Sequence, residues 1–225
     1  MASEPRRDPV ADALLTAENS AFLLIDYQPV QVNSIASMER QRLVSNIVRA
    51  TRAAIGYKLP IVHSTVNVAT GRNKPTIAVL RKMLEAYPTY DRTSINAWED
   101  REFRAAVGAT GRRKLIIAAL WTEACLTFPA LDALREGFEV YALADAVGGT
   151  SVTAHDMALR RIEQAGAQML SVTQMFCELQ RDWARAETYH ATTGLAKAFG
   201  GAYGIGIIYA KTMLGEHASE AGAGA

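Results

Sequence analysis

The sequence predicts a three-layer α/β/α domain built on a central, mainly parallel sheet. Three observations indicate this class. Short apolar runs, typical of buried strands, alternate along the chain with longer segments whose apolar residues recur at helical spacing. Glycines close helical segments, as at Gly137 and Gly166. The 225 residues, of which 49% are hydrophobic, suffice for one domain with a large core. Strands that alternate with helices favour a parallel sheet covered on both faces.

The first half of the chain carries the less regular part of this pattern. An apolar run stops at Asp26, and a second run begins near Pro60, where a strand tolerates the missing N–H. Residues 87–98 are expected to be irregular or briefly extended. We expect strands at 20–25 and 59–68, and helices at 38–57, 76–86 and 99–109.

The second half repeats strand and helix more cleanly. Its last helix is expected to run from about residue 172 to about residue 185. The pattern predicts strands at 114–120, 138–144 and 168–172, separated by helices at 122–136 and 152–165.

The two ends of the chain differ in composition from this central part. Residues 1–16 are polar and charged, and we expect a flexible N-terminal arm. Residues 17–192 are expected to form the α/β domain. Residues 193–225 are rich in Gly and Ala. A segment of this composition cannot stabilise a fold by itself, so we expect it to pack on the domain or at a subunit interface.

The composition excludes several classes of function. Basic and acidic side chains number 24 and 23, so no dominant charge favours nucleic acid or an anionic membrane surface. No apolar run reaches the ~18 residues of a membrane-spanning helix, and no signal peptide is evident. The two cysteines, Cys125 and Cys177, make no disulfide framework, which indicates a cytoplasmic protein with free thiols.

Side chains that carry chemistry follow three of the expected strands. Asp26, Cys125 and Asp145 lie where the carboxyl ends of parallel strands meet, and ligands bind at that edge. Asp26 has an alternative role as a turn residue before Pro29, and Asp145 is better explained as a turn residue. Cys177 is expected to be a buried, inert side chain.

Cys125 lies near the start of an expected helix. Thr122 suits the N-cap of that helix and Glu123 its first turn. A helix N-terminus is positive, so we expect the Cys125 thiol to tend toward the thiolate, below its free pKa of ~8.5. The N–H groups of the same turn are placed to hold an oxyanion.

Several stretches of the chain resemble the isochorismatase-like cysteine hydrolases, which include nicotinamidases and N-carbamoylsarcosine amidase. Residues 21–28 (AFLLIDYQ) are similar to the family's first strand with its catalytic aspartate, and residues 121–125 (WTEAC) to its T-E-x-C nucleophile motif. Residues 94–100 (SINAWED) and 177–183 (CELQRDW) resemble the YcaC-like subgroup. The resemblance covers about residues 21–183 and implies a Rossmann-like, three-layer α/β/α fold.

The resemblance implies the catalytic set Asp26, Arg92 and Cys125. Arg92 stands where nicotinamidases carry lysine; it can hold a carboxylate but cannot shuttle a proton. A cis peptide bond between Leu120 and Trp121 is implied, with an oxyanion hole formed by the N–H groups of Trp121 and Cys125. The substrate-binding residues expected beside these are Asn67, Trp121 and Phe128.

The implied reaction is hydrolysis of an amide, a related C–N bond other than a peptide bond, or an ester of a small molecule, through a thioester on Cys125. The alternative is a catalytically silent binding or scaffold protein on the same fold. A third interpretation is nucleotide binding, suggested by the Gly-rich segments 71–74 and 108–111. Neither segment has the strand-to-helix G-x-G-x-x-G or P-loop context of nucleotide-binding loops.

We expect no metal and no other cofactor. The chain has four histidines, and no Asp-x-His pair follows the second strand, which contains His63. His63 is therefore expected to be packed or hydrogen-bonded rather than a metal ligand. The resemblance also implies a homo-oligomer, from dimer to octamer.

Overall fold

The computed structural model describes residues 8–182 and 188 of the chain. The expected Gly/Ala-rich tail at 193–225 lies outside the described residues. Residues 8–181 belong to one compact unit, which contains every helix and strand discussed below. No helix in the described part of the chain combines the length and apolar character needed to cross a bilayer.

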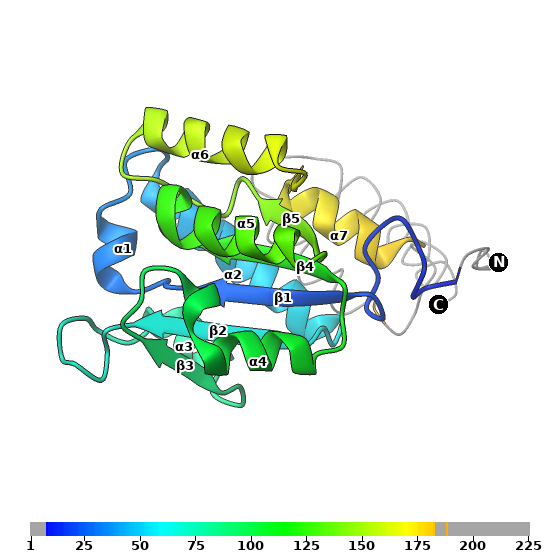
Figure 1. Ribbon diagram of the computed structural model, residues 1–225, viewed down its shortest axis with the longest axis horizontal. Helices are drawn as coiled ribbons and strands as arrows, with labels where there is room; N and C mark the ends of the chain where they lie inside the picture. Colours follow the sequence, from blue (N-terminus) through cyan, green and yellow to red (C-terminus); the bar gives the residue numbers. More distant parts are fainter. Residues whose placement is uncertain (1–7, 183–187, 189–225) are drawn as a thin grey trace, which may run out of the picture. The chain divides into compact units, whose positions relative to one another are not determined.

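A single six-stranded parallel sheet forms the centre of this unit, as the sequence predicts. Its strand order is β3-β2-β1-β4-β5-β6 (Figure 1). The direction of winding reverses between β1 and β4, so the carboxyl ends of these two strands form the topological switch point where ligands bind in such sheets. The strands are β1 Ser20–Ile25, β2 Ile61–Val66, β3 Thr89–Arg92, β4 Lys114–Ala119, β5 Glu139–Leu143 and β6 Gln168–Leu170.

Helices cover both faces of the sheet. Helices α2 and α3 lie on one face and α4, α5 and α6 on the other (Figure 1), as right-handed crossovers require for this strand order. The short helix α1 lies beyond the carboxyl ends of the strands. The α-helices are α1 Pro29–Asn33, α2 Arg40–Gly56, α3 Ala78–Met83, α4 Arg101–Ala109, α5 Thr127–Arg135, α6 Val152–Gln164 and α7 Val172–Gln180.

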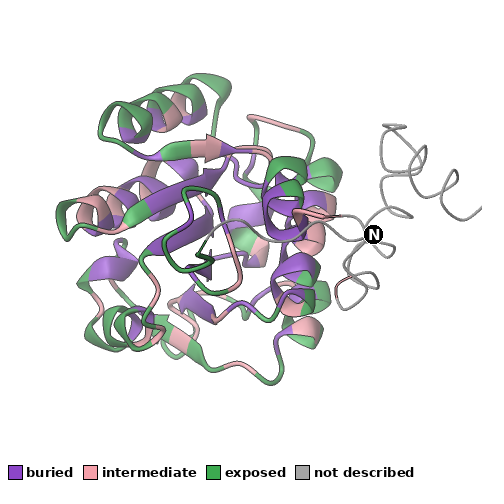
Figure 2. Ribbon diagram, turned by 90° about the vertical axis from the view of Figure 1, so that its right-hand side faces the viewer, coloured by how far each residue is buried: buried purple, intermediate pink, exposed green. Residues whose placement is uncertain are grey.

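The core lies along the central strands. Every residue of β1 and β4 is buried, and Figure 2 shows the buried colour running along the strands and on the helix faces turned toward them. Continuous apolar runs are therefore explained by a sheet that is covered on both faces. The core holds β1 and β4 rigidly in register, which fixes the positions of the residues that follow their carboxyl ends.

The structure differs from the sequence prediction at several points. The residues expected as one helix from 122 to 136 begin with a π-helical turn, Thr122–Leu126, and continue as α5. Residues 87–98 are briefly extended, as expected, at the edge strand β3, and a 3₁₀ turn that was not expected follows at Ala97–Glu99. Cys177 is exposed rather than buried, because α7 turns its neighbours Met175, Phe176 and Leu179 inward instead.

Part of the expected N-terminal arm is packed. Leu15 is fully buried, and its N–H donates to the Glu178 carboxylate at 2.9 Å. The buried Lys114 ammonium donates to the carbonyl oxygens of Asp12 and Ala13. These hydrogen bonds therefore connect residues 12–15 to α7 and to the start of β4.

Candidate active site

Asp26 and Arg92 form a buried, two-pronged ion pair at the carboxyl ends of the strands. The Arg92 Nη1 donates to Asp26 Oδ1 at 2.8 Å and Nη2 donates to Oδ2 at 2.7 Å. Both side chains are shielded from solvent, at 1% and 0% exposed. Such a planar pair fixes the carboxylate in one orientation and keeps it next to a permanent positive charge.

Further contacts hold the Arg92 guanidinium from the other side. Nη1 also donates to Ser64 Oγ at 2.9 Å and to the Thr65 carbonyl at 3.0 Å, and Nη2 donates to the Ile95 carbonyl at 3.1 Å. Sequence reasoning missed Ser64, because a serine inside a buried strand carries no motif. Its role follows only from the parallel pairing of β2 with β3, which places it beside the arginine.

The backbone turns sharply at the ends of β1 and β2. Asp26 and Asn67 adopt left-handed backbone angles, with φ of 60° and 63°. This region is uncommon for residues other than glycine, and Asp and Asn are among those that tolerate it. The turn at Asp26 aims its side chain at Arg92 instead of into the sheet core, whereas the Asn67 N–H donates to the Arg92 carbonyl at 2.7 Å.

Cys125 lies in the π-helical turn that follows β4, and it is 5% exposed. Its thiol lies beside the Asp26 carboxylate and the Trp121 backbone N–H, and both of these groups act on its pKa. The structure therefore brings Asp26, Arg92 and Cys125 together from the ends of β1, β3 and β4. A carboxylate, a fixed cation and a thiol in contact can transfer a proton from sulfur to carboxylate.

The electrostatics correct the expectation of a thiolate at rest. Burial raises the pKa of the Cys125 thiol well above its usual range, and the neighbouring Asp26 carboxylate raises it further. Arg92 and the Trp121 N–H oppose this shift without overcoming it. The expectation of a lowered pKa is wrong because it counted the helix terminus and left out desolvation and the adjacent carboxylate.

The pKa of the Asp26 carboxyl is also raised from its usual range, by burial, against the opposing effect of Arg92. A carboxylate with a raised pKa accepts a proton more readily than an exposed aspartate does. The resting state is thus a neutral thiol that donates to a buried carboxylate. The thiolate has to form during reaction, with Asp26 taking the proton.

The N-cap of the turn that carries Cys125 is not Thr122, the predicted residue. Trp121 occupies the N-cap position, and the Thr122 hydroxyl forms a 2.8 Å hydrogen bond with His155 Nδ1 instead of capping the helix. The Thr122 N–H donates to the Gly148 carbonyl at 2.9 Å. Because Trp121 precedes the turn as its N-cap and no side chain caps it, the prediction for Thr122 is wrong.

Glu123 lies in the first turn, as expected, and it also makes a tertiary contact. Its Oε1 accepts from the Thr150 N–H at 2.9 Å and from the Thr150 hydroxyl at 2.6 Å. A Cβ on Gly149 would lie 2.6 Å from the other carboxylate oxygen, so only glycine fits there without a shift. The loop after β5 therefore fixes the turn that carries Cys125, and the spacing of residues did not reveal this support.

Trp121 and Phe128 flank this turn, and both are half-buried. The peptide bond between Leu120 and Trp121 is cis. The Trp121 ring is fixed by a 2.7 Å hydrogen bond from its Nε1 to Ser34 Oγ, beyond α1. Asn67 is half-buried, and its side-chain oxygen accepts from the Thr70 hydroxyl at 3.2 Å.

The remaining candidate residues lie away from this site. Asp145 is a turn residue, as preferred from the sequence: its Oδ1 accepts from the Val172 N–H at 2.8 Å at the start of α7. His63 is buried, and both its ring nitrogens are hydrogen-bonded to threonines, as detailed below.

Comparison with known proteins places the chain in a family. The sequence model of the isochorismatase domain matches residues 20–174. The chain is 36% identical over 170 residues to the probable hydrolase YcaC of Escherichia coli K12, covering 75% of this chain and 81% of that protein.

Solved structures agree with this relationship. A structure of E. coli YcaC, described as an octameric hydrolase of unknown specificity, matches with a TM-score of 0.79 and 31% identity, over 94% of this chain and 98% of that one. The YcaC of Pseudomonas aeruginosa, solved with hexane-2,5-diol and covalent acrylamide, gives 0.79 and 30%, over 89% and 97%. A nicotinamidase of Bacillus subtilis, at 20% identity and a TM-score of 0.57 over 68% of this chain and 99% of that one, shares the fold. The chain therefore belongs to the isochorismatase family of hydrolases and is similar to its YcaC members.

Proposed function

We propose that the chain is a cysteine hydrolase that cleaves an amide, a related non-peptide C–N bond, or an ester of a small molecule. The observation that carries the proposal is the buried contact of the Cys125 thiol with an Asp26 carboxylate that Arg92 holds by both oxygens. A structural aspartate needs no thiol partner, and a structural cysteine needs no fixed carboxylate. The combination suits proton transfer from sulfur.

The first half-reaction forms a thioester. Asp26 takes the Cys125 proton while the sulfur attacks the substrate carbonyl carbon, and the carbonyl electrons move to oxygen. The backbone N–H groups of Trp121 and Cys125 are proposed to hold this oxyanion. The oxyanion then collapses, the C–N or C–O bond breaks, and the leaving amine or alcohol receives the proton from Asp26.

The second half-reaction releases the acid. Asp26 takes a proton from a water that attacks the thioester carbonyl, and the sulfur leaves and regains that proton. Arg92 remains protonated throughout, since its pKa lies far above neutrality. Its role is to keep Asp26 oriented and to offset the negative charge that moves between Asp26 and Cys125.

A covalent adduct in a related protein supports the proposal. The P. aeruginosa YcaC was solved with a covalent acrylamide, and acrylamide is an electrophile that reacts with thiols. We extend from that protein the inference that Cys125 is the reactive thiol of this chain. We further propose that Asn67, Trp121 and Phe128, which are all half-buried, contact the substrate.

The assembly and location are proposed from the same relatives. E. coli YcaC is octameric, and we propose a homo-oligomer for this chain, with a cytoplasmic location in which Cys125 stays reduced. No cofactor is required by the steps above.

The experiment that tests the function is trapping of the acyl-enzyme. A panel of small amides and esters is mixed with the full-length protein, and intact mass reports an adduct of the acyl group. We expect the adduct in the parent protein and its loss in Cys125→Ala, with Cys177→Ala as the matched cysteine control. An adduct that survives Cys125→Ala, or that disappears in Cys177→Ala, contradicts the proposal.

One observation favours the second candidate, a silent binding protein. The Cys125 thiol is protonated at rest, and the cation beside it cannot relay a proton. That candidate predicts tight binding of a panel compound with neither turnover nor adduct. The trapping experiment therefore separates the two functions.

A further inference from the structure

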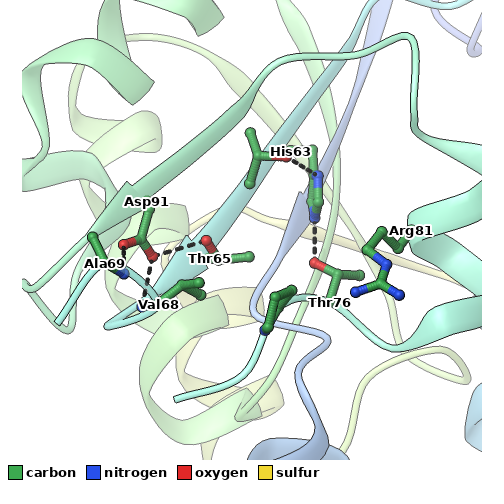
Figure 3. A pocket seen from close by; sticks show the side chains of 9 residues that line it. His63, Thr65, Val68, Ala69, Thr76, Arg81 and Asp91 are labelled. Atoms are coloured by element: carbon green, nitrogen blue, oxygen red, sulfur yellow. Dashed lines mark hydrogen bonds between the residues drawn. The ribbon is translucent and has the colours of Figure 1, made fainter. Parts of the chain in front are cut away.

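A pocket lies beside strands β2 and β3, and none of the three proposed catalytic side chains lines it. Its volume is about 350 Å³, within the range of small-molecule sites. His63 and Thr65 line it from β2 (Figure 3). Successive side chains of a strand point to opposite faces, so these two lie on the other face from Ser64, which contacts Arg92. The pocket thus lies on the opposite face of β2 from the contact between Ser64 and Arg92.

The inner wall of this pocket is polar but neutral. His63 is 2% exposed, its Nε2 is 2.7 Å from Thr76 Oγ1, and its Nδ1 is 3.2 Å from Thr89 Oγ1. Burial lowers the pKa of His63 to about 4, so the ring is uncharged at neutral pH. With both nitrogens hydrogen-bonded, the uncharged His63 ring shapes the wall of the pocket.

Asp91 supplies a negative charge at one side. Its carboxylate accepts from the Thr65 hydroxyl at 2.9 Å, the Val68 N–H at 3.1 Å and the Ala69 N–H at 2.8 Å. Burial raises the pKa of Asp91, but these donors outweigh it and the pKa is lowered. Within the described part of the chain, Oδ2 accepts from the Ala69 N–H alone, so it retains a site for a further donor.

Arg81 supplies a positive charge at the opposite side. It lies in the last turn of α3, and Figure 3 shows it across the pocket from Asp91. No ion pair or hydrogen bond of its guanidinium occurs among residues 8–182. The lining between these two charges includes the apolar side chains of Val68, Ala69 and Pro75.

We propose that this pocket binds a small zwitterion, with a carboxylate facing Arg81, an ammonium facing Asp91, and an aliphatic chain along the apolar lining. One unpaired cation opposite a carboxylate with a free lone pair matches a ligand that carries both charges. A ligand with only one charge satisfies only one side. The proposal concerns a pocket that none of the proposed catalytic side chains lines, and it does not depend on the proposed hydrolase function.

Calorimetric titration of the full-length protein tests the proposal. The probes are glycine, 4-aminobutanoate and 6-aminohexanoate, with butanoate and butylamine as singly charged comparisons. We expect saturable binding of at least one amino acid, and binding of butanoate and butylamine that is weaker by about fivefold or more, as expected for loss of a partly exposed charge pair. No saturable binding of any amino acid, or equal binding of butanoate, overturns the proposal.

Two neighbouring residues of α3 provide matched variants. Arg81→Gln removes the charge that lines the pocket and is expected to weaken amino-acid binding by about fivefold. Lys82→Gln removes a charge from the same exposed helix turn outside the lining and is expected to leave binding unchanged. Equal effects of the two variants overturn the assignment, as does a change in oligomer mass in Arg81→Gln, which indicates a subunit contact.

A third variant separates this proposal from the hydrolase function. Cys125→Ala removes the proposed nucleophile, and amino-acid binding in the pocket beside β2 and β3 is expected to persist in it. Loss of binding in Cys125→Ala shows that the probes occupy the catalytic site, which also overturns the proposal.

Discussion

Arg92 contacts both oxygens of Asp26, at 2.8 and 2.7 Å, in a region from which solvent is excluded. This single contact joins the ends of β1 and β3 across the intervening strand β2. Because each charge is buried with the other, neither can be removed without leaving its partner uncompensated. The stability of the fold and the proposed catalysis therefore depend on the same ion pair.

Replacement of Arg92 by Met is expected to destabilise the fold by about 3–5 kcal/mol, since it leaves a buried carboxylate unpaired. Arg92→Lys is expected to cost less, because a charge remains although the second hydrogen bond to Asp26 is lost. Urea denaturation measures both. Arg135→Met is the control: Arg135 pairs with Asp132 at 2.8 Å while 77% exposed, and it should change stability by less than about 1 kcal/mol. Equal losses for Arg92→Met and Arg135→Met contradict the argument.

The role of Asp26 as proton acceptor predicts how Cys125 reacts. Acrylamide is small and uncharged, and it should label Cys125 in the parent protein at neutral pH. Asp26→Asn removes the general base and should slow this labelling by about 100-fold, an effect that outweighs the lower pKa of the thiol once the Asp26 charge is gone. Peptide mass mapping over time measures both cysteines.

Cys177 serves as the internal control in that experiment. It is exposed on α7, away from the site, and its labelling should be the same in both proteins. If Cys125 is not labelled in the parent protein, or is labelled equally in Asp26→Asn, Asp26 does not act as its base.

The stability of the fold should depend on pH through His63. Its pKa falls by burial from 6.5 to about 4, so between these values the unfolded chain binds the proton that the folded protein lacks. Stability is therefore fully present above pH 6.5 and is lost as pH falls toward 4, by up to about 3 kcal/mol. His155, with a pKa also lowered by burial, contributes in the same direction.

Comparison of the parent protein with His63→Gln isolates the contribution of His63. The amide of Gln offers both a donor and an acceptor to the neighbouring threonines and does not titrate in this range. The variant should show a smaller loss of stability between pH 6.5 and 4 in urea denaturation. An identical pH dependence in the two proteins would show that His63 is not the group responsible.

The parts of the fold that the sequence predicts well are those with a local signal. Continuous apolar runs mark β1 after Ser20 and β4 after Lys114, because a strand covered on both faces is apolar along most of its length. Strand β3 is an edge strand with exposed and polar residues, so its pattern does not differ from that of a loop. The π-helical turn at Thr122–Leu126 also lacks a local signal, since tertiary contacts of Thr122 and Glu123 set its geometry.

The residues of the candidate site also differ in whether the sequence alone reveals them. Asp26 and Cys125 are candidates from the sequence because each follows a buried strand, and strand ends converge in a parallel sheet, although a turn role for Asp26 remained an equal alternative. Arg92 was identified by resemblance alone, since an arginine between polar residues carries no pattern. The protonation state of Cys125 required the structure, because desolvation depends on burial and on the approach of Asp26.

Gly149 provides a test of whether its close contacts hold the turn that carries Cys125. A Cβ at this position would lie 2.6 Å from Glu123 Oε2 and 3.0 Å from the His155 Cβ, so Gly149→Ala displaces the two groups that fix the turn. We expect a loss of stability of about 1–3 kcal/mol and slower labelling of Cys125 by acrylamide. Gly108→Ala is the matched control: its Cβ meets nothing within 4 Å inside α4, and it should stabilise the protein by up to about 1 kcal/mol. Thermal denaturation and the labelling rate measure both variants, and a Gly149→Ala protein with unchanged stability and unchanged labelling would show that the turn does not depend on this contact.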